Sequence, residues 1–280
     1  MVRWSDLQLG ELRAGTQARY KTSLAQLDKH FAGRPLAGIK PVDINNYAVA
    51  RMQGGVSAAT VRRDLTVANR VLRVAKRAGW IGTNPVPDEA AELPERREPI
   101  QPVPLRVLAT VLRAAPRRFG QLIRFLALTG CRMEEAAGLP VDAVNLARGT
   151  VTFSRTKTRS PRVIQLRPGA LRLLRSMDLP GTPGTLVFRS DRTKERFNNV
   201  SGQFRALVAR CDVPHFRAHD LRHTFGIRWL QGGGDIYDLS RYLGHTSVKT
   251  TEIYTKWLSL PLSGPGTNAG TAGSRNRRKA

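Results

Sequence analysis

The sequence predicts a mainly α-helical protein of two domains, with a small β-sheet in the second domain. Apolar residues recur at helical spacing through most of both halves. Residues 83–104 contain six prolines and little periodicity, which indicates a linker or an extended crossing segment. Residues 149–166 alternate between apolar and polar side chains around a basic turn, as a β-hairpin does. We therefore predict domains at 1–95 and 105–258, a linker at 96–104 and a disordered basic tail at 259–280.

The charge of the chain narrows the classes of partner. Its 280 residues include 46 Lys and Arg against 21 Asp and Glu, a net charge of +25 with a pI near 11.5. Such an excess favours a polyanion such as nucleic acid. A basic ribosomal-type protein, or a genome-wide preference for arginine, would leave the same composition. No apolar run is long enough for a membrane span, and the N-terminus has no secretory h-region. We expect a cytoplasmic, nucleoid-associated protein with no membrane partner.

Three helices are expected in the first domain. The first spans 16–31, the second starts with Pro41 in position N1, and the third runs from Ser57 to Gly79. The third helix has one apolar face, and the rest of its surface is basic apart from Asp64. An ordinary solvated face would look the same. We favour DNA contact for its basic residues: Arg62, Arg63, Arg70, Arg73, Lys76 and Arg77.

Helices and one hairpin are expected in the second domain. The helices are predicted at 105–115, 121–129, 168–177, 197–211, 218–231 and 236–242. The apolar positions of the hairpin are Val151 and Phe153 on one strand, and Val163 and Leu166 on the other. Residues 185–188 are a candidate further strand. A last helix, capped by Ser247, is expected to carry Tyr254.

Two arginines in separate segments suggest a phosphate site. Arg132 lies at the expected start of a helix, where free backbone N–H groups also favour an anion. Arg222 lies three residues after His219, so both side chains share one face of a helix. Guanidinium groups bind the non-bridging oxygens of a phosphodiester bidentately and are always charged. Glu135, one turn after Arg132, is expected to hold that arginine in place.

A nucleophile and proton carriers accompany the arginines. The phenol of Tyr254 follows two glycine-containing turns, and it needs nearby cations and a base to attack phosphorus. His219 is a candidate to accept the phenol proton or to bond the phosphate. His245 is a candidate donor to a non-bridging oxygen. Lys157, in the basic turn of the hairpin, is the candidate acid for the leaving 5′ oxygen.

Plainer interpretations exist for these residues. Lys157 stands in a run that would ordinarily be solvated charge: Arg155, Arg159 and Arg162. Four-residue spacing equally fits a metal-binding face made of His215, His219 and His223. Pro214 disfavours the continuous helix that such a face requires. We therefore expect no metal, and a structural role in helix packing for His223.

Four motifs occur in a fixed order along the second half. They are TGCRMEEAAGL at 129–139, TKTRSPRVIQL at 156–166, HDLRHTFG at 219–226 and YLGHTSVKTTEIY at 242–254. Together they closely resemble the signature of the tyrosine recombinase (phage integrase) family. The resemblance covers 105–257, and residues 16–31 and 59–85 look like the core-binding domain of that family.

The resemblance implies a role for each matching residue. The catalytic positions are Arg132, Lys157, His219, Arg222, His245 and the nucleophile Tyr254, with Glu135 as the supporting acid. It implies a C-shaped clamp on double-stranded DNA, formed by a helical core-binding domain and an α+β catalytic domain. Family members cut one strand at a time through a 3′-phosphotyrosine within a homotetramer, pass through a Holliday junction, and need no metal or other cofactor. Arg155 and Arg159 are then expected to contact DNA, and accessory DNA-bending or directionality proteins are candidate partners.

The sequence therefore predicts a site-specific DNA recombinase or integrase. A non-catalytic DNA-binding protein of the same fold is one alternative, but such a protein would have no reason to keep all six reactive residues. A metal-dependent nuclease that uses the three-histidine face is the other alternative.

Overall fold

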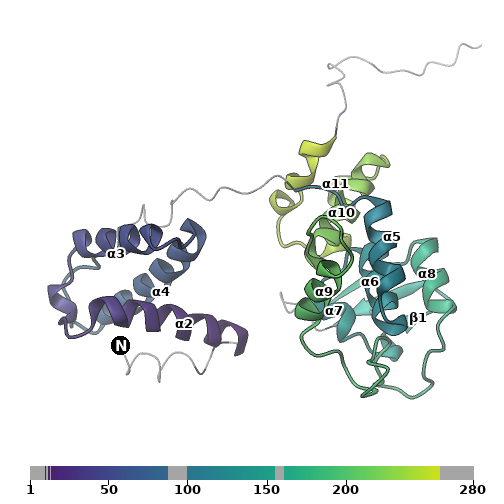
Figure 1. The fold of residues 1–280 in the computed structure, drawn as a ribbon, viewed down its shortest axis with the longest axis horizontal. Helices are drawn as coiled ribbons and strands as arrows, with labels where there is room; N and C mark the ends of the chain where they lie inside the picture. The colour runs from purple at the N-terminus through teal and green to yellow at the C-terminus, as the bar shows by residue number, and fades with distance from the viewer. Residues whose placement is uncertain (1–9, 11, 13, 88–99, 155–160, 259–280) are drawn as a thin grey trace, which may run out of the picture. The chain divides into compact units, whose positions relative to one another are not determined.

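The chain divides into two units, Met1–Glu98 and Pro99–Ala280, and each has a hydrophobic core of its own (Figure 1). The computed structural model describes residues 10, 12, 14–87, 100–154 and 161–258. Helices predominate in both units, and the second unit also contains a three-stranded sheet. The predicted fold class, mainly α with a small sheet, is confirmed.

The described residues of the first unit form three helices, α2 (Ala14–Phe31), α3 (Pro41–Gln53) and α4 (Ala58–Arg77), with a 3-10 turn, η1 (Leu36–Gly38), between α2 and α3. Pro41 takes the first position of α3, where its missing N–H costs no hydrogen bond. α4 packs against both other helices. The predicted apolar face of α4 is buried throughout: Val61, Leu65, Ala68, Leu72 and Ala75. This face fixes which side of α4 is turned to solvent.

Asp64 of α4 belongs to the core of the first unit. Its side chain is buried and accepts hydrogen bonds from the Tyr47 hydroxyl at 2.8 Å and from Arg51 Nη2 at 3.2 Å. Since Asp64 is the acidic residue of α4 and is directed toward α3, the solvent side of α4 carries only basic charge.

The described part of the second unit contains seven helices and three strands. The helices are α5 (Leu105–Ala114), α6 (Arg117–Thr129), α7 (Met133–Ala137), α8 (Pro168–Arg175), α9 (Val200–Ala209), α10 (Ala218–Gln231) and α11 (Ile236–Leu243) among the described residues. The strands are β1 (Val144–Asn145), β2 (Thr150–Phe153) and β3 (Arg162–Gln165). Short 3-10 turns are η3 (Val141–Ala143), η4 (Val248–Thr250) and η5 (Glu252–Trp257).

The sheet is antiparallel with the order β1-β2-β3. Val151 pairs with Ile164 and Phe153 pairs with Arg162, so these four side chains lie on one face. Ile164 is buried, whereas the side chain of Val163 is 64% exposed. Val163, named among the apolar positions of the hairpin, therefore lies on the solvent face. Since alternate residues of a strand share a face, the buried Leu166 has Ile164 and Arg162 as its partners.

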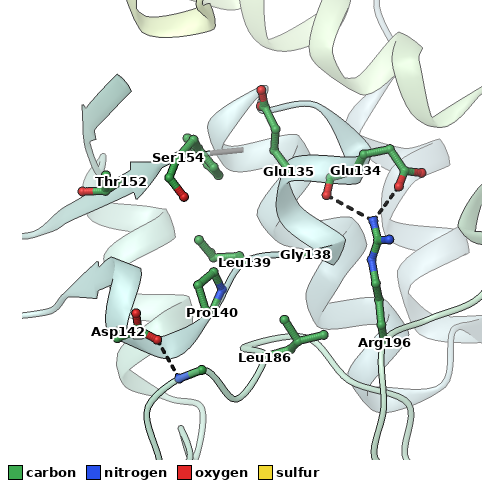
Figure 2. A pocket seen from close by; sticks show the side chains of 12 residues that line it. Glu134, Glu135, Gly138, Leu139, Pro140, Asp142, Thr152, Ser154, Leu186 and Arg196 are labelled. Carbon is green, nitrogen blue, oxygen red and sulfur yellow. Dashed lines mark hydrogen bonds and ion pairs between the residues drawn. The ribbon is translucent and has the colours of Figure 1, made fainter. Parts of the chain in front are cut away.

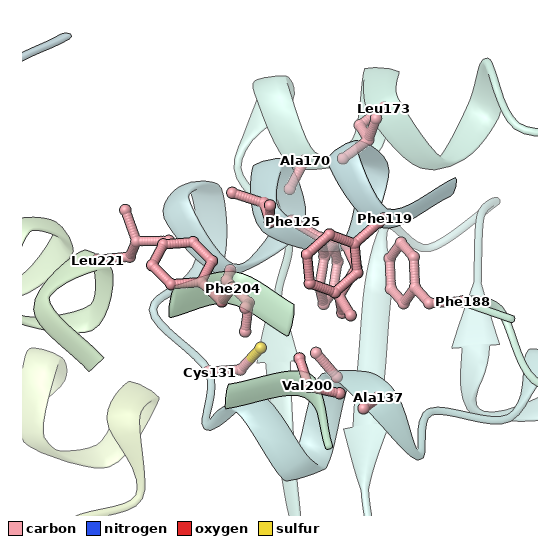
Figure 3. Close-up of a cluster of buried hydrophobic side chains, with 14 of the residues drawn as sticks. Phe119, Phe125, Cys131, Ala137, Ala170, Leu173, Phe188, Val200, Phe204 and Leu221 are labelled. Atoms are coloured by element: carbon pink, nitrogen blue, oxygen red, sulfur yellow. The ribbon is translucent and has the colours of Figure 1, made fainter. Parts of the chain in front are cut away.

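α6 runs through the centre of the second unit. It packs against α10, α8, α7 and α5 and buries Phe119, Leu122, Ile123, Phe125 and Leu126. Phe125 meets Phe188 at a ring distance of 5.1 Å, and both lie within the buried cluster of Figure 3. A second, smaller cluster joins α10, α11 and η5, and it contains Phe225, Ile227, Leu230, Leu239, Leu243 and Tyr254.

Several predicted boundaries differ from the structure. α6 begins at Arg117 rather than at residue 121. Its first turn is polar apart from the buried Phe119, so it lacks the apolar pattern on which the prediction depended. Residues 185–188 form no strand; Leu186 makes only an isolated bridge with Pro140. Tyr254 lies on the 3-10 turn η5 rather than on an α-helix, and Ser247 caps η4. None of the described helices is both long enough and apolar enough to cross a membrane.

Candidate active site

α10 carries three candidate residues near its start. Asp220 caps the N-terminus of this helix. Its carboxylate accepts a hydrogen bond from the Arg217 backbone N–H at 2.7 Å, which satisfies an otherwise unpaired donor. His219, Arg222 and His223 then follow at three- and four-residue spacing on one side of the helix.

Arg222 is buried where three elements meet. Arg222 is only 3% exposed. Its two terminal nitrogens donate to the Gly130 carbonyl and to the Leu243 carbonyl, both at 2.8 Å. Burial, together with the charge of Arg132, lowers the pKa of Arg222 to about 10. The guanidinium is therefore charged at neutral pH and is fixed by the main chain at the ends of α6 and α11.

Arg132 reaches the same turn from α7, where it is the N-cap residue. Its Nη1 donates to Glu135 Oε1 and its Nη2 to the Gly244 carbonyl, both at 3.1 Å. Its backbone N–H also donates to Glu135 Oε2 at 2.9 Å. A quarter of the Arg132 side chain stays exposed, which makes it more accessible to a ligand than Arg222.

Arg162 is a third arginine at this site, and its position contradicts the sequence-based interpretation of it as a solvated charge. Its Nη1 and Nη2 donate to the two carboxylate oxygens of Glu135, each at 2.8 Å. Its Nε donates to the Tyr242 carbonyl at 3.1 Å, and only 11% of its side chain is exposed. Strand register gives the reason, because Arg162 shares the inward face of β3 with Ile164. The two-residue spacing of Arg162 and Ile164 is visible in the sequence, and it predicts that both lie on the same face of a strand.

The C-terminal end of α11 accepts all three arginines. The consecutive carbonyls of Tyr242, Leu243 and Gly244 bond Arg162, Arg222 and Arg132 respectively. The last carbonyls of a helix lack intrahelical partners and carry the negative end of its dipole. Gly244 closes α11 in the left-handed conformation at φ 68°, and a Cβ there would come within 2.9 Å of Arg162. The turn is therefore built for close approach of arginine.

Glu135 balances this concentration of positive charge. Burial by itself would raise the pKa of Glu135, but the hydrogen bonds and charge of Arg162, with further bonds from Arg132, lower it overall. Glu135 is thus an ionised carboxylate between two arginines.

His245 follows the arginine-bound turn directly. Its Nδ1 lies 2.7 Å from the Thr251 hydroxyl, and its backbone N–H donates to the Ser240 carbonyl at 3.0 Å. Burial, then the charges of Arg222 and Arg132, lower the pKa of His245 to about 4. The imidazole is neutral at neutral pH, and its Nε2 is the ring nitrogen opposite the one that meets Thr251.

Tyr254 is buried against α10. Its hydroxyl lies 3.1 Å from His223 Nδ1, and the His223 ring meets the His219 ring edge-on at 4.5 Å. Burial raises the pKa of Tyr254, while the charge of Arg222 opposes that rise. Burial, then the charge of His219, lowers the pKa of His223 to about 4. The neutral imidazole therefore meets a neutral phenol, and His223 touches the candidate nucleophile directly, which its predicted packing role did not include.

His219 occupies the outer end of this row of rings and is exposed. Partial burial of its ring, then the charge of Arg222, lowers the pKa of His219. It is therefore neutral at neutral pH and accessible, as a proton acceptor must be.

Three of the predicted site residues, Lys157, Arg155 and Arg159, lie outside the described residues. His215 is exposed in the loop before α10, so it does not share a helix face with His219 and His223. Within the part of the chain that the structure describes, no group of three or more His, Cys, Asp or Glu residues is arranged to hold a metal ion. The three-histidine face is not formed.

A cavity of about 640 Å³ has Glu135 among the residues that line it (Figure 2). It is lined by residues of α7, β2 and the 184–196 loop, and Arg196 and Glu134 form an ion pair at its edge. The Glu135 carboxylate points away from Leu139 and Pro140 (Figure 2). Arg132, His219, Arg222, His245 and Tyr254 do not line the cavity, so it is separate from the place where the arginines converge.

The basic side of α4 is the second candidate functional surface. Arg63, Arg73, Lys76 and Arg77 are exposed, and Arg62 and Arg70 are partly exposed. Arg70 lies over the Tyr20 ring at 5.8 Å and donates to its hydroxyl at 3.4 Å. These residues form a continuous positive surface along one helix.

Chemically, the main cluster suits an anionic tetrahedral centre. Two buried or half-buried guanidiniums, a neutral imidazole beside them and a phenol in the field of Arg222 supply donors for oxyanions and an oxygen nucleophile. The model of the phage integrase family matches residues 105–259, more than half of the chain. The chain belongs to the phage integrase family. The match begins with α5 and includes every arginine and histidine of the cluster.

Relatives of this integrase-family chain extend the likeness to both units. It is 28% identical over 264 residues to the tyrosine recombinase XerC of Mesorhizobium japonicum, covering 82% of this chain and 79% of that protein. A lambda integrase dimer bound to a COC′ core site has a TM-score of 0.75 at 17% identity, over 89% of this chain and 94% of that one. A lambda integrase tetramer bound to a Holliday junction has a TM-score of 0.76 at 17% identity, over 90% and 75% of the two chains. These structures support the fold.

Proposed function

We propose that the chain is a tyrosine-type site-specific recombinase that cuts and rejoins DNA through a 3′-phosphotyrosine and a Holliday junction. One observation carries the proposal. Arg132 and Arg222 come from segments ninety residues apart, yet the adjacent carbonyls of Gly244 and Leu243 hold them together beside His245. Such a pair of guanidiniums is what a phosphodiester requires when extra negative charge develops on its non-bridging oxygens.

The proposed cleavage step is a transfer of phosphorus between two oxygens. Tyr254 Oη attacks the scissile phosphorus, the new P–O bond forms, and the bond to the 5′ oxygen breaks. Arg132, Arg222 and His245 donate to the non-bridging oxygens. The phenol proton passes to the imidazole of His219, and Lys157 protonates the leaving 5′ oxygen. Rejoining reverses these transfers when another 5′ hydroxyl attacks the phosphotyrosine.

The proposal needs no cofactor. The phosphotyrosine conserves the energy of the phosphodiester bond, so no nucleotide has to be hydrolysed for rejoining. Fixed arginines supply the positive charge that a metal ion would otherwise bring.

The two units take separate roles in this proposal. Residues 1–95 form a core-binding domain that follows the DNA backbone with the basic side of α4. Residues 105–258 form the catalytic domain, 96–104 the linker, and 259–280 a basic tail. The lambda integrase structures, a dimer on a core site and a tetramer on a Holliday junction, support double-stranded DNA as the substrate and a homotetramer as the acting form. Such an enzyme works at the nucleoid, and DNA-bending or directionality proteins are candidate partners.

A nicked duplex tests the proposal. A pool of duplexes with a randomised core and a nick close to the cleavage position lets the short cut strand diffuse away and traps the covalent complex. We expect wild-type protein to give a protein–DNA band on a denaturing gel, also in the presence of EDTA. Tyr254→Phe should abolish the band, and Tyr237→Phe, which removes an exposed hydroxyl of α11, should retain it.

Three results would count against this function. Cleavage by Tyr254→Phe would contradict the nucleophile. Cleavage that EDTA abolishes would favour the metal-dependent nuclease. Tight binding of a DNA site without any covalent band would favour a non-catalytic DNA-binding protein. DNA recovered from the wild-type band gives the target sequence.

A further inference from the structure

We propose that Arg162 is a positioning residue for strand cleavage, which fixes Arg132 through Glu135 and fixes the turn before His245 through the Tyr242 carbonyl. This inference rests on the proposed recombinase function. It assigns Arg162 no contact with DNA, because only 11% of its side chain is exposed.

The contact between Arg162 and Glu135 is stronger than that between Arg132 and Glu135. Arg162 makes two parallel bonds of 2.8 Å, one to each carboxylate oxygen, in the fork geometry that suits guanidinium and carboxylate. The Arg132 guanidinium makes a single bond of 3.1 Å to one of those oxygens. The orientation of the carboxylate is therefore set mainly by Arg162, and Arg132 adapts to it.

Arg162 also reaches the other side of the site. Its Nε donates to the Tyr242 carbonyl at 3.1 Å, at the end of α11. Its guanidinium lies over the Phe153 ring at 4.7 Å, which restrains it from the side of β2. A Cβ on Gly244 would approach the Arg162 side chain to 2.9 Å, so the turn that precedes His245 rests directly on this arginine. One side chain thus connects β2, β3, α7 and α11.

Loss of Arg162 changes what Arg132 can do. Glu135 is almost fully buried, with its side chain 3% exposed, and would keep a charge with one arginine in place of two. A buried carboxylate that has lost one of its partners attracts the remaining cation more strongly. Arg132 would then turn toward Glu135 and offer less of its charge to a phosphate. A lysine at this position keeps the charge but lacks the planar fork that places separate nitrogens opposite the two carboxylate oxygens and the carbonyl.

The test compares two substrates that differ by one substituent on the scissile phosphorus. The probes are the nicked duplex of the sequence recovered from wild-type complexes, and the same duplex with a methylphosphonate at the scissile position. The methyl group replaces a non-bridging oxygen and removes the negative charge. An arginine that acts on that charge matters less for the uncharged substrate, whereas general damage to the fold affects both substrates alike.

We expect Arg162→Ala to slow single-turnover cleavage of the phosphodiester at saturating protein by about 10- to 100-fold, less than the roughly 10²- to 10³-fold cost of losing a donor that touches the oxyanion. DNA affinity should change by less than about threefold, since the contact acts mainly on the transition state. On the methylphosphonate, the defect should shrink by about tenfold or more, in parallel with that of Arg132→Ala. Arg162→Lys should restore only part of the cleavage rate that Arg162→Ala loses.

Arg196→Ala is the matched control, because Arg196 pairs with Glu134, the neighbour of Glu135 on α7, at the exposed rim of the cavity. Its cleavage rate should stay near wild type. The proposal is overturned if Arg162→Ala cleaves like Arg196→Ala, or if its defect is the same on both substrates. If Arg162→Ala does not fold, as judged by circular dichroism, the same comparison is made with Arg162→Lys. Absence of a covalent band with wild-type protein would instead sink the recombinase function itself.

Discussion

Tyr254 and His223 form the most consequential pair at the scale of single residues. The phenol is 1% exposed and its hydroxyl meets a neutral imidazole, so the DNA-free protein holds its candidate nucleophile protonated and away from solvent. A buried hydroxyl without a partner is costly, and this bond therefore stabilises the position of η5. We infer that attack on DNA requires Tyr254 to leave His223.

A double-mutant cycle tests this pair. His223→Phe removes the hydrogen-bonding nitrogen while keeping an aromatic ring, so the Tyr254 hydroxyl stays buried without its partner and the free energy of unfolding should fall by about 1–3 kcal/mol. In the Tyr254→Phe background the same change should cost less, with a coupling energy of about 1 kcal/mol. Urea unfolding at pH 7, where His223 is neutral, measures all four proteins.

Tyr237→Phe serves as the comparison for that cycle, because the Tyr237 side chain is 61% exposed. It should show no coupling to His223→Phe. Independent, additive costs for His223→Phe and Tyr254→Phe would mean that the hydrogen bond contributes nothing to stability.

Residue types and spacing predicted most of the cluster from the sequence. Arg132, Arg222 and His245 could be chosen because each type suits a phosphate and stands at a helix start or a glycine turn. Arg162 could not be chosen, because one position in a basic run is distinguished only by burial. The alternation of β3 nevertheless offered a second signal, since Arg162 shares a face with the apolar Ile164 and Leu166, whereas the apolar positions chosen, Val163 and Leu166, lie on opposite faces.

At the scale of elements, the contact between α10 and η5 depends on the absence of a side chain. A Cβ on Gly226 would lie 2.6 Å from Cε2 of the Tyr254 ring, a distance that packed atoms do not reach. The glycine lies inside a helix, where it has a poor intrinsic preference. Its role is therefore to let the Tyr254 ring lie directly on the backbone of α10.

We expect Gly226→Ala to lower the free energy of unfolding by about 1–3 kcal/mol, as overpacking of a core does. Gly15→Ala in α2 is the matched control, since a Cβ there meets no atom within 4 Å. Because Gly15 lies in the first turn of α2, helix preference should make that control more stable by less than the roughly 1 kcal/mol that a helix interior gives. Urea unfolding of both variants decides the matter, and a gain for Gly226→Ala equal to that of Gly15→Ala would refute the contact.

Elements were predictable where an apolar stripe or a capping residue marks them. α10 begins and ends as predicted, because Asp220 and the Gly232-Gly233-Gly234 run mark its ends. α6 was placed too short because its first turn carries Arg117 and Arg118 rather than an apolar stripe. Tyr254 lies on the 3-10 turn η5 and packs on Gly226 of α10, a tertiary contact that local spacing does not encode.

The charge of the whole molecule should govern its affinity for DNA. Each phosphate that a Lys or Arg neutralises releases counterions, so the logarithm of the binding constant falls by about 0.9 per contact for each tenfold rise in salt. Replacing Arg63, Arg73, Lys76 and Arg77 by alanine removes four exposed charges of α4. If all four contact phosphates, the slope should become shallower by about 3–4. Fluorescence anisotropy over a salt series measures the slope.

A control set carries the same change of net charge. Arg106, Arg113, Arg172 and Arg175 are exposed on α5 and α8, which hold none of the candidate site residues. Their replacement by alanine should change the slope by less than half as much. Equal effects of the two sets would show that α4 offers only diffuse charge.

The main-chain carbonyls at the end of α11 have one more consequence, which concerns tolerance to sequence drift. A carbonyl is present whatever side chain its residue carries, so substitutions at Tyr242 or Leu243 leave the acceptors of Arg162 and Arg222 in place. Gly244 and Glu135 differ, because the left-handed turn and the carboxylate each depend on residue identity. The arginine contacts therefore depend on residue identity at Gly244 and Glu135, whereas Tyr242 and Leu243 are constrained only by the packing of their side chains in the cluster that contains Tyr254.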